Sequence, residues 1–227
     1  AGIEVVTGVM EHEALALNRF FMTAHKKHRP YVILKWAQSK EGFLDRIRKS
    51  HSETPVLLST PVTRLMVHKL RSEVQAIMVG TNTVILDNPS LTVRYWAGRS
   101  PLRITIDRHQ RIPDHLHLFD GRRPTLVYSE QVNDSVHFLR NIIMPDLYKR
   151  NIHSLLVEGG AQLHHSFLKA DLWDEIIVET APVRLGEGVA AAAFQCISQV
   201  RLSGVKEVPA FSRHRHESSL IAIYTHR

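Results

Sequence analysis

The sequence predicts an α/β protein whose mixed, mainly parallel sheet carries helices on both faces. Three observations favour this fold class. Short apolar strands alternate with helical segments from Pro30 onward. Two of these strands end in glycine, at Gly80 and at Gly159-Gly160, and the carboxyl ends of strands are where open α/β sheets bind ligands. The C-terminal ranges Val200–Val208 and Ser219–Thr225 instead alternate apolar and polar residues, as antiparallel strands do.

The N-terminal residues 1–29 differ from the rest of the chain. Glu11–Lys27 carries an imperfect apolar stripe, which includes Leu15 and Phe20 and predicts one helix. The basic cluster His25–Arg29 follows at its end. We therefore expect residues 1–29 to be a linker or the tail of a preceding domain, and residues 30–227 to form one domain.

Hydrophobic patterning and turn residues predict the elements of residues 30–227 in order. Thr60 and Pro61 supply a capping hydroxyl and a proline suited to a first helical turn. The threonine-rich segment after Gly80 is expected to be a turn. The expected strands are Tyr31–Trp36, Ala76–Val79, Arg103–Ile106, Thr125–Tyr128, Ser154–Val157 and Glu175–Thr180, and the expected helices are Thr60–Ser72, Asp146–Asn151 and Ala161–Ala170.

Composition limits the classes of protein that the chain can represent. Its 227 residues are 44% hydrophobic and 22% charged, which suits a domain with a full core. A net charge of +7 favours anionic partners such as phosphorylated metabolites, nucleic acid or acidic membrane. The single Cys196 cannot form an internal disulfide and is expected to be a buried, inert thiol. No apolar run approaches the roughly 20 residues of a membrane helix, and the start AGIEVVTG lacks the features of a signal peptide, so we expect a cytoplasmic protein without a membrane partner.

Residues 76–94, AIMVGTNTVILDNPSLTVR, form the first of two motifs that indicate a ligand site. Gly80 has no Cβ and therefore permits a ligand to approach the backbone closely. Thr81 and Thr83 offer hydroxyl groups to a phosphate or a ribose, and Arg94 offers a planar guanidinium. This pattern is typical of a strand end that contacts a small polar ligand.

The second motif joins the strand Ser154–Val157 to a helix through Glu158, Gly159 and Gly160. A strand end, a diglycine and a helix N-terminus together suit an anion. A lone diglycine is more often only a tight turn. Two glycine-bearing strand ends in one domain, however, predict a phosphate-containing cofactor and a phosphorylated substrate.

Three blocks of the chain, in order, resemble the reductase of riboflavin biosynthesis that forms the C-terminal domain of bacterial RibD. The blocks are RPYVILKWAQSKEGFLD, MVGTNTVILDNPSLTVR and LLVEGGAQLHHSFLKADLWDEIIVETAPVRLGEG, and the resemblance covers residues 30–227. It implies a dihydrofolate-reductase-like fold, a homodimer, and NADPH-dependent reduction of 5-amino-6-(5-phosphoribosylamino)uracil to 5-amino-6-(5-phosphoribitylamino)uracil. The N-terminal stretch resembles the end of the zinc deaminase domain of RibD. Because the deaminase needs a Cys-x-x-Cys pair and this chain has one cysteine, we expect the deaminase half to be absent.

The resemblance also implies roles for individual residues. Arg71, Leu91 and Arg94 occupy substrate-binding positions, and a guanidinium can hold two oxygens of a ribose phosphate at once. Glu158 occupies a substrate-contacting position and is the candidate catalytic residue, because a carboxyl group could stabilise the open, imine-like substrate that accepts the hydride. By sequence alone, Arg71 also fits a solvated helix residue, and Asp87 and Glu158 also fit turn residues. The implied cofactor positions are Ala37, Thr83, Asp87, Gly159, Gly160, Ala161, Gln162 and Leu163.

Two segments depart from the pattern of the family. Ser39-Lys40-Glu41-Gly42 stands where many relatives carry Ser-Asp-Gly or Leu-Asp-Gly, so Glu41 either replaces the aspartate or faces solvent. Residues 54–59 lack the usual Ser-x-Trp contacts, which leaves Leu57 for apolar packing and Thr54 or Ser59 as a source of a hydroxyl.

No metal site is predicted. His164 and His165 are adjacent and point to different faces of a helix, and His115-x-His117 and His214-x-His216 lack a third ligand nearby. We expect the histidines of the two His-x-His pairs to lie on the surface.

Two other functions compete with this interpretation. A pterin or folate reductase of the same fold would carry a folate-binding acid after the first strand and no phosphate-binding arginine pair, so Arg71, Arg94 and the Glu158–Gly160 motif argue against it. A basic nucleic-acid-binding module would interleave basic and aromatic residues. The Lys and Arg residues here are scattered and only 7% of residues are aromatic, which disfavours that class.

Overall fold

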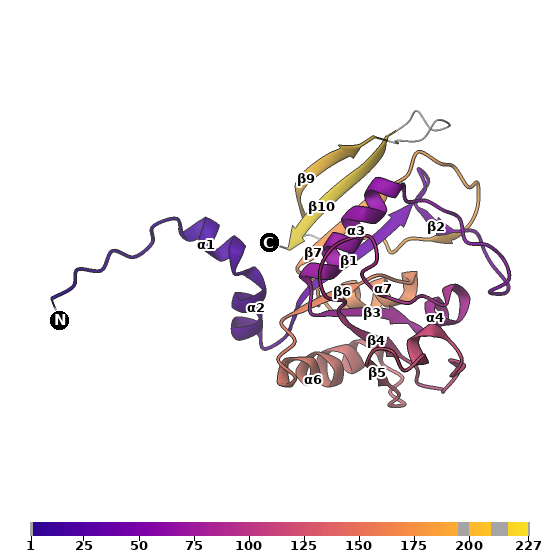
Figure 1. The fold of residues 1–227 in the computed structure, drawn as a ribbon, viewed down its shortest axis with the longest axis horizontal. Coiled ribbons are helices and arrows are strands. Elements are labelled where there is room, and N and C mark those ends of the chain that lie inside the picture. The colour runs from indigo at the N-terminus through magenta and orange to yellow at the C-terminus, as the bar shows by residue number, and fades with distance from the viewer. Residues whose placement is uncertain (1, 195–199, 210–217, 227) are drawn as a thin grey trace.

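The computed structural model describes residues 2–194, 200–209 and 218–226, and Figure 1 shows their arrangement. Cys196 and the His214-x-His216 pair therefore lie outside the described residues. The strands are β1 (Tyr31–Gln38), β2 (Phe43–Asp45), β3 (Ala76–Gly80), β4 (Leu102–Ile106), β5 (Thr125–Tyr128), β6 (Ser154–Val157), β7 (Glu175–Thr180), β8 (Val189–Ala190), β9 (Val200–Val208) and β10 (Ser219–His226). The helical elements are α1 (Glu11–Leu17), α2 (Arg19–Lys27), α3 (Pro61–Glu73), α4 (Thr81–Asp87), η1 (His117–Phe119), α5 (Ser135–His137), η2 (Phe138–Ile143), α6 (Met144–Lys149) and α7 (Ala161–Lys169).

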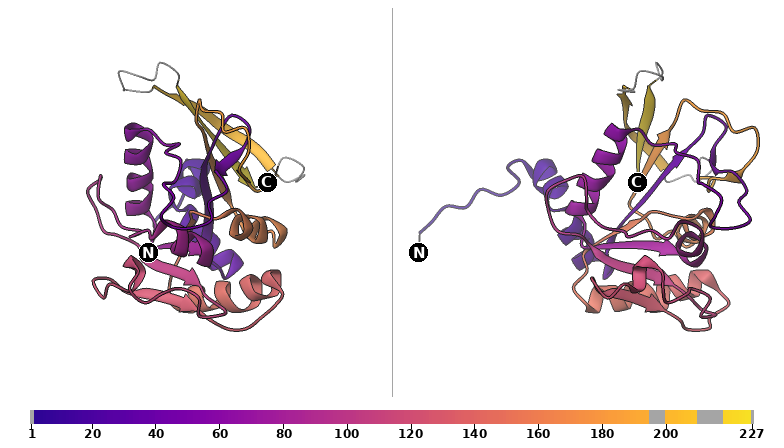
Figure 2. Two further views of the ribbon diagram at one scale, coloured as in Figure 1. Left: turned by 90° about the vertical axis from the view of Figure 1, so that its right-hand side faces the viewer. Right: turned by 45° about the vertical axis from the view of Figure 1, so that its right-hand side comes forward.

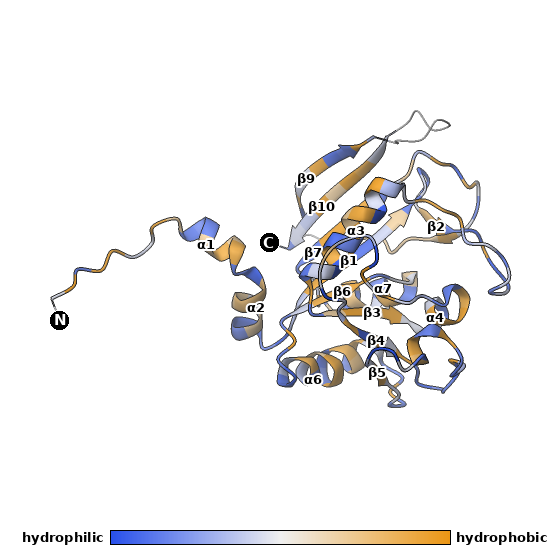
Figure 3. Ribbon diagram, in the orientation of Figure 1, coloured by the Kyte–Doolittle hydropathy of each residue, from blue (hydrophilic) through white to orange (hydrophobic). Residues whose placement is uncertain are grey.

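Eight strands form one mixed sheet in the order β5-β4-β3-β6-β1-β7-β10-β9. The pairs from β5 to β7 are all parallel, and β10 pairs antiparallel with both β7 and β9. The mixed, mainly parallel sheet predicted from the sequence is thus confirmed. Its central strands β3, β6 and β1 carry nearly unbroken apolar residues, visible in orange in Figure 3, because both of their faces are covered.

Two apolar cores lie on opposite faces of the sheet, because successive strand residues point to opposite sides. Ile33 of β1 and Ile77 of β3 pack with Leu70 of α3 and Val84 of α4 in one core. The neighbouring residues of the same strands pack against η2, α6 and α7 in the other core, which contains Phe138, Leu147 and Phe167. Figure 2 shows α3 and α7 on the two sides of the sheet, as expected from the sequence.

The chain order brings the two glycine-bearing strand ends together. After β3 the chain continues outward to β4 and β5, and β6 then inserts between β3 and β1. Because these strands are parallel, Gly80 at the end of β3 and Glu158 after β6 lie at the same edge of the sheet. The two motifs that the sequence places 78 residues apart (158 − 80) therefore form one site.

The structure corrects three predicted elements and adds one. The helix expected over Glu11–Lys27 is broken at Asn18, whose side-chain amide donates to the Ala14 carbonyl at 2.9 Å and ends α1. The segment expected as a turn after Gly80 is the helix α4, which packing of the fully buried Val84 stabilises. The helix expected to start at Asp146 begins at Met144 and continues a helical run from Ser135. The small sheet of β2 and β8 was not predicted.

The helix α2 is attached to the sheet domain, whereas the chain before it extends away from the domain in Figure 1. Phe20 packs on Tyr31 with ring centroids 5.3 Å apart. Lys27 and Arg29 both contact the buried carboxylate of Asp174, at 2.8 and 2.5 Å. Among the described residues, no helix combines the length and the apolar character needed to cross a membrane.

Candidate active site

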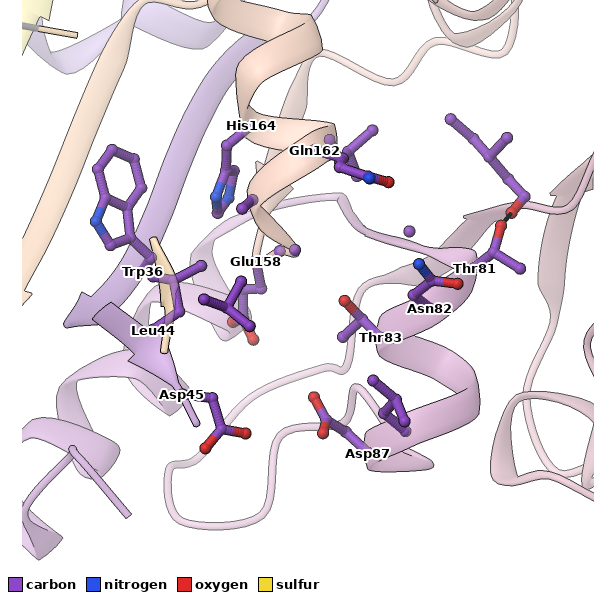
Figure 4. A pocket seen from close by; sticks show the side chains of 18 of the residues that line it. Trp36, Leu44, Asp45, Thr81, Asn82, Thr83, Asp87, Glu158, Gln162 and His164 are labelled. Carbon is purple, nitrogen blue, oxygen red and sulfur yellow. Dashed lines mark hydrogen bonds between the residues drawn. The ribbon is translucent and has the colours of Figure 1, made fainter. Parts of the chain in front are cut away.

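A cavity of about 780 Å³ lies at the carboxyl ends of the central strands. Its lining includes Ala37 of β1, Gly80 of β3, Ile106 of β4 and Glu158 after β6. Figure 4 shows Trp36 and His164 on one side of this cavity and α4, with Thr81 and Thr83, on the other. The position agrees with the general location of ligand sites in open α/β sheets.

The diglycine loop follows β6 and is held against the end of β3 by backbone hydrogen bonds. The Gly80 N–H donates to the Gly159 carbonyl at 3.0 Å, and the Glu158 N–H donates to the Met78 carbonyl at 3.0 Å. Gly159 has a φ of +138°, a conformation that side chains rarely adopt, and the Gly159–Gly160 peptide bond is cis. A Cβ at Gly160 would lie 3.2 Å from the Thr83 hydroxyl oxygen, so that α4 and the loop are in close contact.

The predicted cofactor residues lie together along this cavity. Ala37, Thr83, Asp87 and the run from Gly159 to Leu163 all line it. Leu163 is 8% exposed and packs into a core, whereas Gln162 is exposed, so the two neighbours differ in the way they face the cavity. The sequence thus located these residues correctly as neighbours, although their roles stay predictions.

Glu158 and Arg71 form a two-pronged ion pair beside the cavity. Arg71 donates from Nε to Oε1 at 2.8 Å and from Nη2 to Oε2 at 2.5 Å, and both side chains are 12% exposed. Burial alone would raise the pKa of Glu158, but the Arg71 guanidinium lowers it below its ordinary value, with a further contribution from the charge of Lys35. Arg71 is therefore not the solvated helix residue that the sequence left open, and Glu158 is not a solvated turn residue.

The other predicted substrate residues lie on the loop after α4. Leu91 is buried with a φ of +51°, and the third donor of Arg71 contacts the Thr92 carbonyl at 3.1 Å. The Arg94 side chain is exposed and does not line the cavity, and its guanidinium lies 5.8 Å from the Tyr95 ring. The loop thus carries Arg94 and also contacts Arg71 through the Thr92 carbonyl, but the Arg94 side chain lies outside the lining of the cavity.

His68 of α3 contacts the same loop through a hydrogen bond and a ring contact. Its Nδ1 accepts the backbone N–H of Arg94 at 2.9 Å, and its ring packs edge-on against Tyr95. Burial, together with the positive charges of Arg71 and Arg94, lowers the pKa of His68 to about 4. A neutral His68 therefore supports the loop at Arg94 and Tyr95, a role that no local sequence motif indicates.

Asp87 closes α4 and is bound by an arginine from a distant loop. Arg48 contacts the Asp87 carboxylate and also donates to the Asp45 carboxylate at 2.6 Å and to the Leu86 carbonyl at 3.1 Å. This Arg48 clamp fixes the loop after β2 over one end of the cavity. The sequence singled out Asp87 but gave no signal for its partner, which lies 39 positions away.

Lys35 is the cavity residue that sequence reasoning missed most clearly. It is 12% exposed, lines the cavity and lies 3.7 Å from the carboxylate of Glu179 on β7. The Ser59 hydroxyl donates to the same carboxylate at 2.7 Å, so it is engaged by Glu179. A single lysine within the apolar strand YVILKWAQ was the signal that could have identified it.

The two segments that depart from the family have separate outcomes. Glu41 does not line the cavity but is exposed, and its carboxylate accepts the Ser39 hydroxyl at 2.8 Å and the Leu185 N–H at 3.2 Å. Leu57 is 57% exposed, so it does not replace the missing tryptophan surface. Pro55 and Val56 line the cavity from this segment.

The histidines form no metal centre among the described residues, where no group of three or more His, Cys, Asp or Glu could hold a metal ion. His164 is buried and its Nε2 donates to the Val157 carbonyl at 3.0 Å, while His165 is exposed. The two neighbours thus point to different faces of α7, as expected, and burial lowers the pKa of His164 to about 4. His117 binds the backbone of Asn88 through its Nδ1 at 2.8 Å.

These features define the class of protein: a dihydrofolate-reductase-like α/β domain with a cavity at the carboxyl edge of its sheet. Residues 30–209 match the RibD C-terminal domain family, and the chain belongs to that family of riboflavin-biosynthesis reductases.

Three relatives illustrate the similarity. Riboflavin biosynthesis protein RibD of Aquifex aeolicus is 36% identical over 205 residues, which is 83% of this chain and 56% of that protein. The 2,5-diamino-6-ribosylamino-4(3H)-pyrimidinone 5′-phosphate reductase of the same organism is 31% identical over 70% of this chain and 79% of its own length. The crystal structure of a Thermotoga maritima diaminohydroxyphosphoribosylaminopyrimidine deaminase/5-amino-6-(5-phosphoribosylamino)uracil reductase superimposes with a TM-score of 0.81 at 27% identity, covering 100% of this chain and 65% of that one. The chain therefore spans little more than half the length of its RibD relative.

Proposed function

We propose that this domain reduces 5-amino-6-(5-phosphoribosylamino)uracil to 5-amino-6-(5-phosphoribitylamino)uracil with NADPH. The observation that carries the proposal is the Glu158–Arg71 pair, which borders the same cavity as the diglycine loop. A carboxylate, an arginine and a phosphate-binding loop at one strand edge combine the groups needed for a phosphorylated sugar and a dinucleotide. Family membership supports the reaction class.

The cavity fits a dinucleotide cofactor in size and in its lining. Its volume of about 780 Å³ lies within the range of roughly 300–1,000 Å³ common for cofactor sites. The small Ala37 leaves room for a nicotinamide at β1, and the glycines allow a pyrophosphate to approach the backbone near the start of α7. Thr83 offers a hydroxyl opposite the same loop. When bound, the cofactor supplies a hydride.

Arg71 and Arg94 are the residues that we propose for the substrate phosphate. The Arg71 guanidinium donates to the Thr92 carbonyl of the loop of residues 91–94, and the backbone N–H of Arg94 in the same loop donates to His68. The exposed Arg94 is free to turn toward a phosphate at the rim of the cavity. Leu91 would support this loop from within the core rather than contact the phosphate.

Glu158 and Lys35 are the residues that we propose to assist the chemistry. The ribose must open before C1′ can accept a hydride, and ring opening places a proton on the ring oxygen and positive charge on the imine. The Lys35 ammonium can supply a proton from Nζ, and the Glu158 carboxylate can stabilise the positive charge. Both groups line the cavity near Ala37 on β1, which supports their joint action.

The test compares two substrates that differ at one ring position. The purified domain is incubated with NADPH and either the aminouracil or the 2,5-diamino-pyrimidinone phosphate that the relative's name gives. We expect absorbance at 340 nm to fall only when substrate is present, with the higher kcat/KM for the aminouracil. A higher kcat/KM for the diamino compound would assign that substrate instead, and no oxidation with either would refute the proposal.

A pterin or folate reductase is the second candidate that shares the fold. No observation favours it over the phosphoribosyl substrate, because the Arg71–Glu158 pair occupies the substrate side of the cavity. Dihydrofolate and a dihydropterin serve as negative controls in the same assay. A nucleic-acid-binding function also lacks support, because the Lys and Arg residues are scattered along the sequence and only 7% of residues are aromatic.

Three further predictions about the whole protein accompany this function. We propose that the protein is a cytoplasmic homodimer and that residues 1–29 link the reductase domain to a deaminase domain. The apolar side chains of Ile3, Val5 and Val9, each more than two thirds exposed, support a role for this stretch in contacting another domain. Light scattering during gel filtration tests the dimer, since a mass of one chain, 25.9 kDa, would contradict it.

A further inference from the structure

The loop between β4 and β5 brings two arginines to the end of the cavity that lies beside α4. Arg108 and Arg111, called here the β4–β5 arginine pair, line the cavity together with Thr81 and Asn82. Sequence reasoning did not single out either arginine. Neither belongs to the Glu158–Arg71 pair, and both follow β4, which β3 and β6 separate from β1 in the sheet.

Asp107 holds this loop in a fixed shape. Its Oδ1 accepts the Arg111 N–H at 3.0 Å, and its Oδ2 accepts the Ile112 N–H at 2.9 Å. Its own N–H donates to the Tyr128 carbonyl at 2.8 Å, which continues the pairing of β4 with β5. Because the buried Asp107 carboxylate is engaged by backbone donors, it forms no ion pair with either arginine among the described residues.

Arg108 lacks the carboxylate partner that a half-buried arginine usually has. Its guanidinium packs 4.7 Å from the centre of the Phe138 ring, and its Nε is buried with no hydrogen-bond partner in the described part of the chain. The nearest acidic influence is Asp134, whose carboxylate accepts the Val136 and His137 N–H groups at the start of α5. Arg108 is thus positioned by packing and keeps its donors available for a ligand.

Arg111 presents a second guanidinium on the same side. One of its nitrogens donates to the Asn82 side-chain oxygen at 2.5 Å, which directs the side chain across the start of α4. Asn82 is uncharged, so this contact leaves the positive charge of Arg111 uncompensated. The pair therefore forms a positively charged corner that a dianionic group would fit.

The remaining cations around the cavity are mostly neutralised. Lys35 pairs with Glu179, and Arg48 pairs with Asp45 and Asp87. Arg46 is exposed and lines the cavity, and it belongs to the loop after β2, in which Arg48 contacts Asp87 at the C-terminal end of α4. Arg111 contacts Asn82 at the start of α4, so the β4–β5 arginine pair and the loop that carries Arg46 lie beside opposite ends of that helix.

We propose that Arg108 and Arg111 bind the 2′-phosphate on the adenosine half of NADPH and make the site select NADPH over NADH. The inference rests on the proposed function, because it assumes that a nicotinamide dinucleotide fills the cavity. Two guanidinium groups can hold a phosphate dianion through several charge-assisted hydrogen bonds, and NADP sites commonly use arginine for this phosphate. The adenosine then lies beyond α4 and the nicotinamide lies beside Ala37 and Glu158.

The test measures dissociation constants by titration calorimetry for NADPH and NADH, and for the fragments 2′,5′-ADP and 5′-AMP. The variants are R108A, R111A and the double variant, with R46A as the matched control on the loop beside the other end of α4. We expect the wild-type protein to bind NADPH at least tenfold tighter than NADH. We expect R108A to weaken NADPH and 2′,5′-ADP at least tenfold, and the double variant to weaken them further, while NADH and 5′-AMP change less than threefold.

Three results would overturn the inference. Equal affinity of the wild-type protein for NADPH and NADH would remove the selectivity itself. Equal losses for NADPH and NADH in R108A and the double variant would assign the arginines a general structural role, and a loss of selectivity in R46A would place the phosphate at the other end. If the wild-type protein bound neither dinucleotide, the proposed function would fall as well, which separates the two failures. Circular dichroism melting of each variant shows that it is folded.

Discussion

Replacement of Glu158 by glutamine probes both the fold and the proposed chemistry. In the native protein two hydrogen bonds at 2.8 and 2.5 Å join Glu158 to Arg71, and each side chain is 12% exposed. Glutamine keeps the size and one acceptor oxygen but removes the charge, so that Arg71 retains only neutral acceptors such as the Thr92 carbonyl. Loss of one partner of a buried ion pair typically costs about 3–5 kcal/mol, and the retained acceptor favours the lower end of that range.

The expected outcome is thus a free energy of unfolding lower by about 3 kcal/mol, measured by urea denaturation at pH 7.5. The matched control is Glu73→Gln on α3, the helix that also carries Arg71, where the Lys69–Glu73 pair is 3.8 Å apart and its side chains are 47–54% exposed. That surface pair should contribute less than about 0.5 kcal/mol. Equal effects of the two substitutions would refute the claim that the Glu158–Arg71 pair is buried and strong.

The same variant separates a catalytic role of Glu158 from a structural one. Under conditions where the variant is fully folded, kcat/KM for the aminouracil should fall at least tenfold, which corresponds to about 1.4 kcal/mol of transition-state stabilisation. The dissociation constant of NADPH should change little, because backbone groups rather than Glu158 would hold the pyrophosphate. A folded variant with wild-type kcat/KM would remove Glu158 from the proposed mechanism.

Four other predictions follow from individual contacts. Arg94→Ala should raise KM for substrate by an amount equivalent to roughly 1.5–3 kcal/mol while NADPH affinity hardly changes, and steady-state kinetics with calorimetry checks both. Gly159→Ala should destabilise the protein by about 1–2 kcal/mol in urea denaturation because φ is +138° there, whereas Gly204→Ala, where a Cβ meets nothing within 4 Å, should not. The folded-state pKa of His68 is lowered from 6.5 to about 4, so its contribution to stability is complete above pH 6.5 and is lost as the pH falls toward 4. Between pH 7.5 and pH 5 this loss lowers the free energy of unfolding by on the order of 1–2 kcal/mol, and His68→Gln should remove that part of the decrease in a urea titration at each pH. EDTA should leave the reductase rate unchanged, and a loss of rate on chelation would require a metal that we do not predict.

Local sequence signals predicted the sheet and the diglycine loop well. Strand β3 is a short apolar run that ends in Gly80, and β6 is a short apolar run that Glu158 and the diglycine follow, so composition, length and termination all agreed. The start of α3 was equally clear, because the Thr60 hydroxyl and the Thr63 side chain form reciprocal capping contacts with Pro61 in the first turn.

Long-range contacts decided what the sequence could not predict. Arg71 and Glu158 lie 87 positions apart, and Arg48 and Asp87 lie 39 apart, so no local pattern contains either pair. The segment after Gly80 carries threonines that favour a turn, but burial of Val84 against the sheet made it helical. The β4–β5 arginine pair gave no signal because a basic loop of this kind is usually a solvated surface.

The most direct test of the proposed reductase function follows the hydride itself. NADPH that carries deuterium at both C4 positions of the dihydronicotinamide is incubated with the domain and 5-amino-6-(5-phosphoribosylamino)uracil, and the product is analysed by mass spectrometry and NMR. We predict one deuterium per product molecule, at C1′ of the ribityl chain, with one NADPH oxidised for each. Product without deuterium at C1′, or oxidation of NADPH without formation of the ribityl product, would contradict the proposed function.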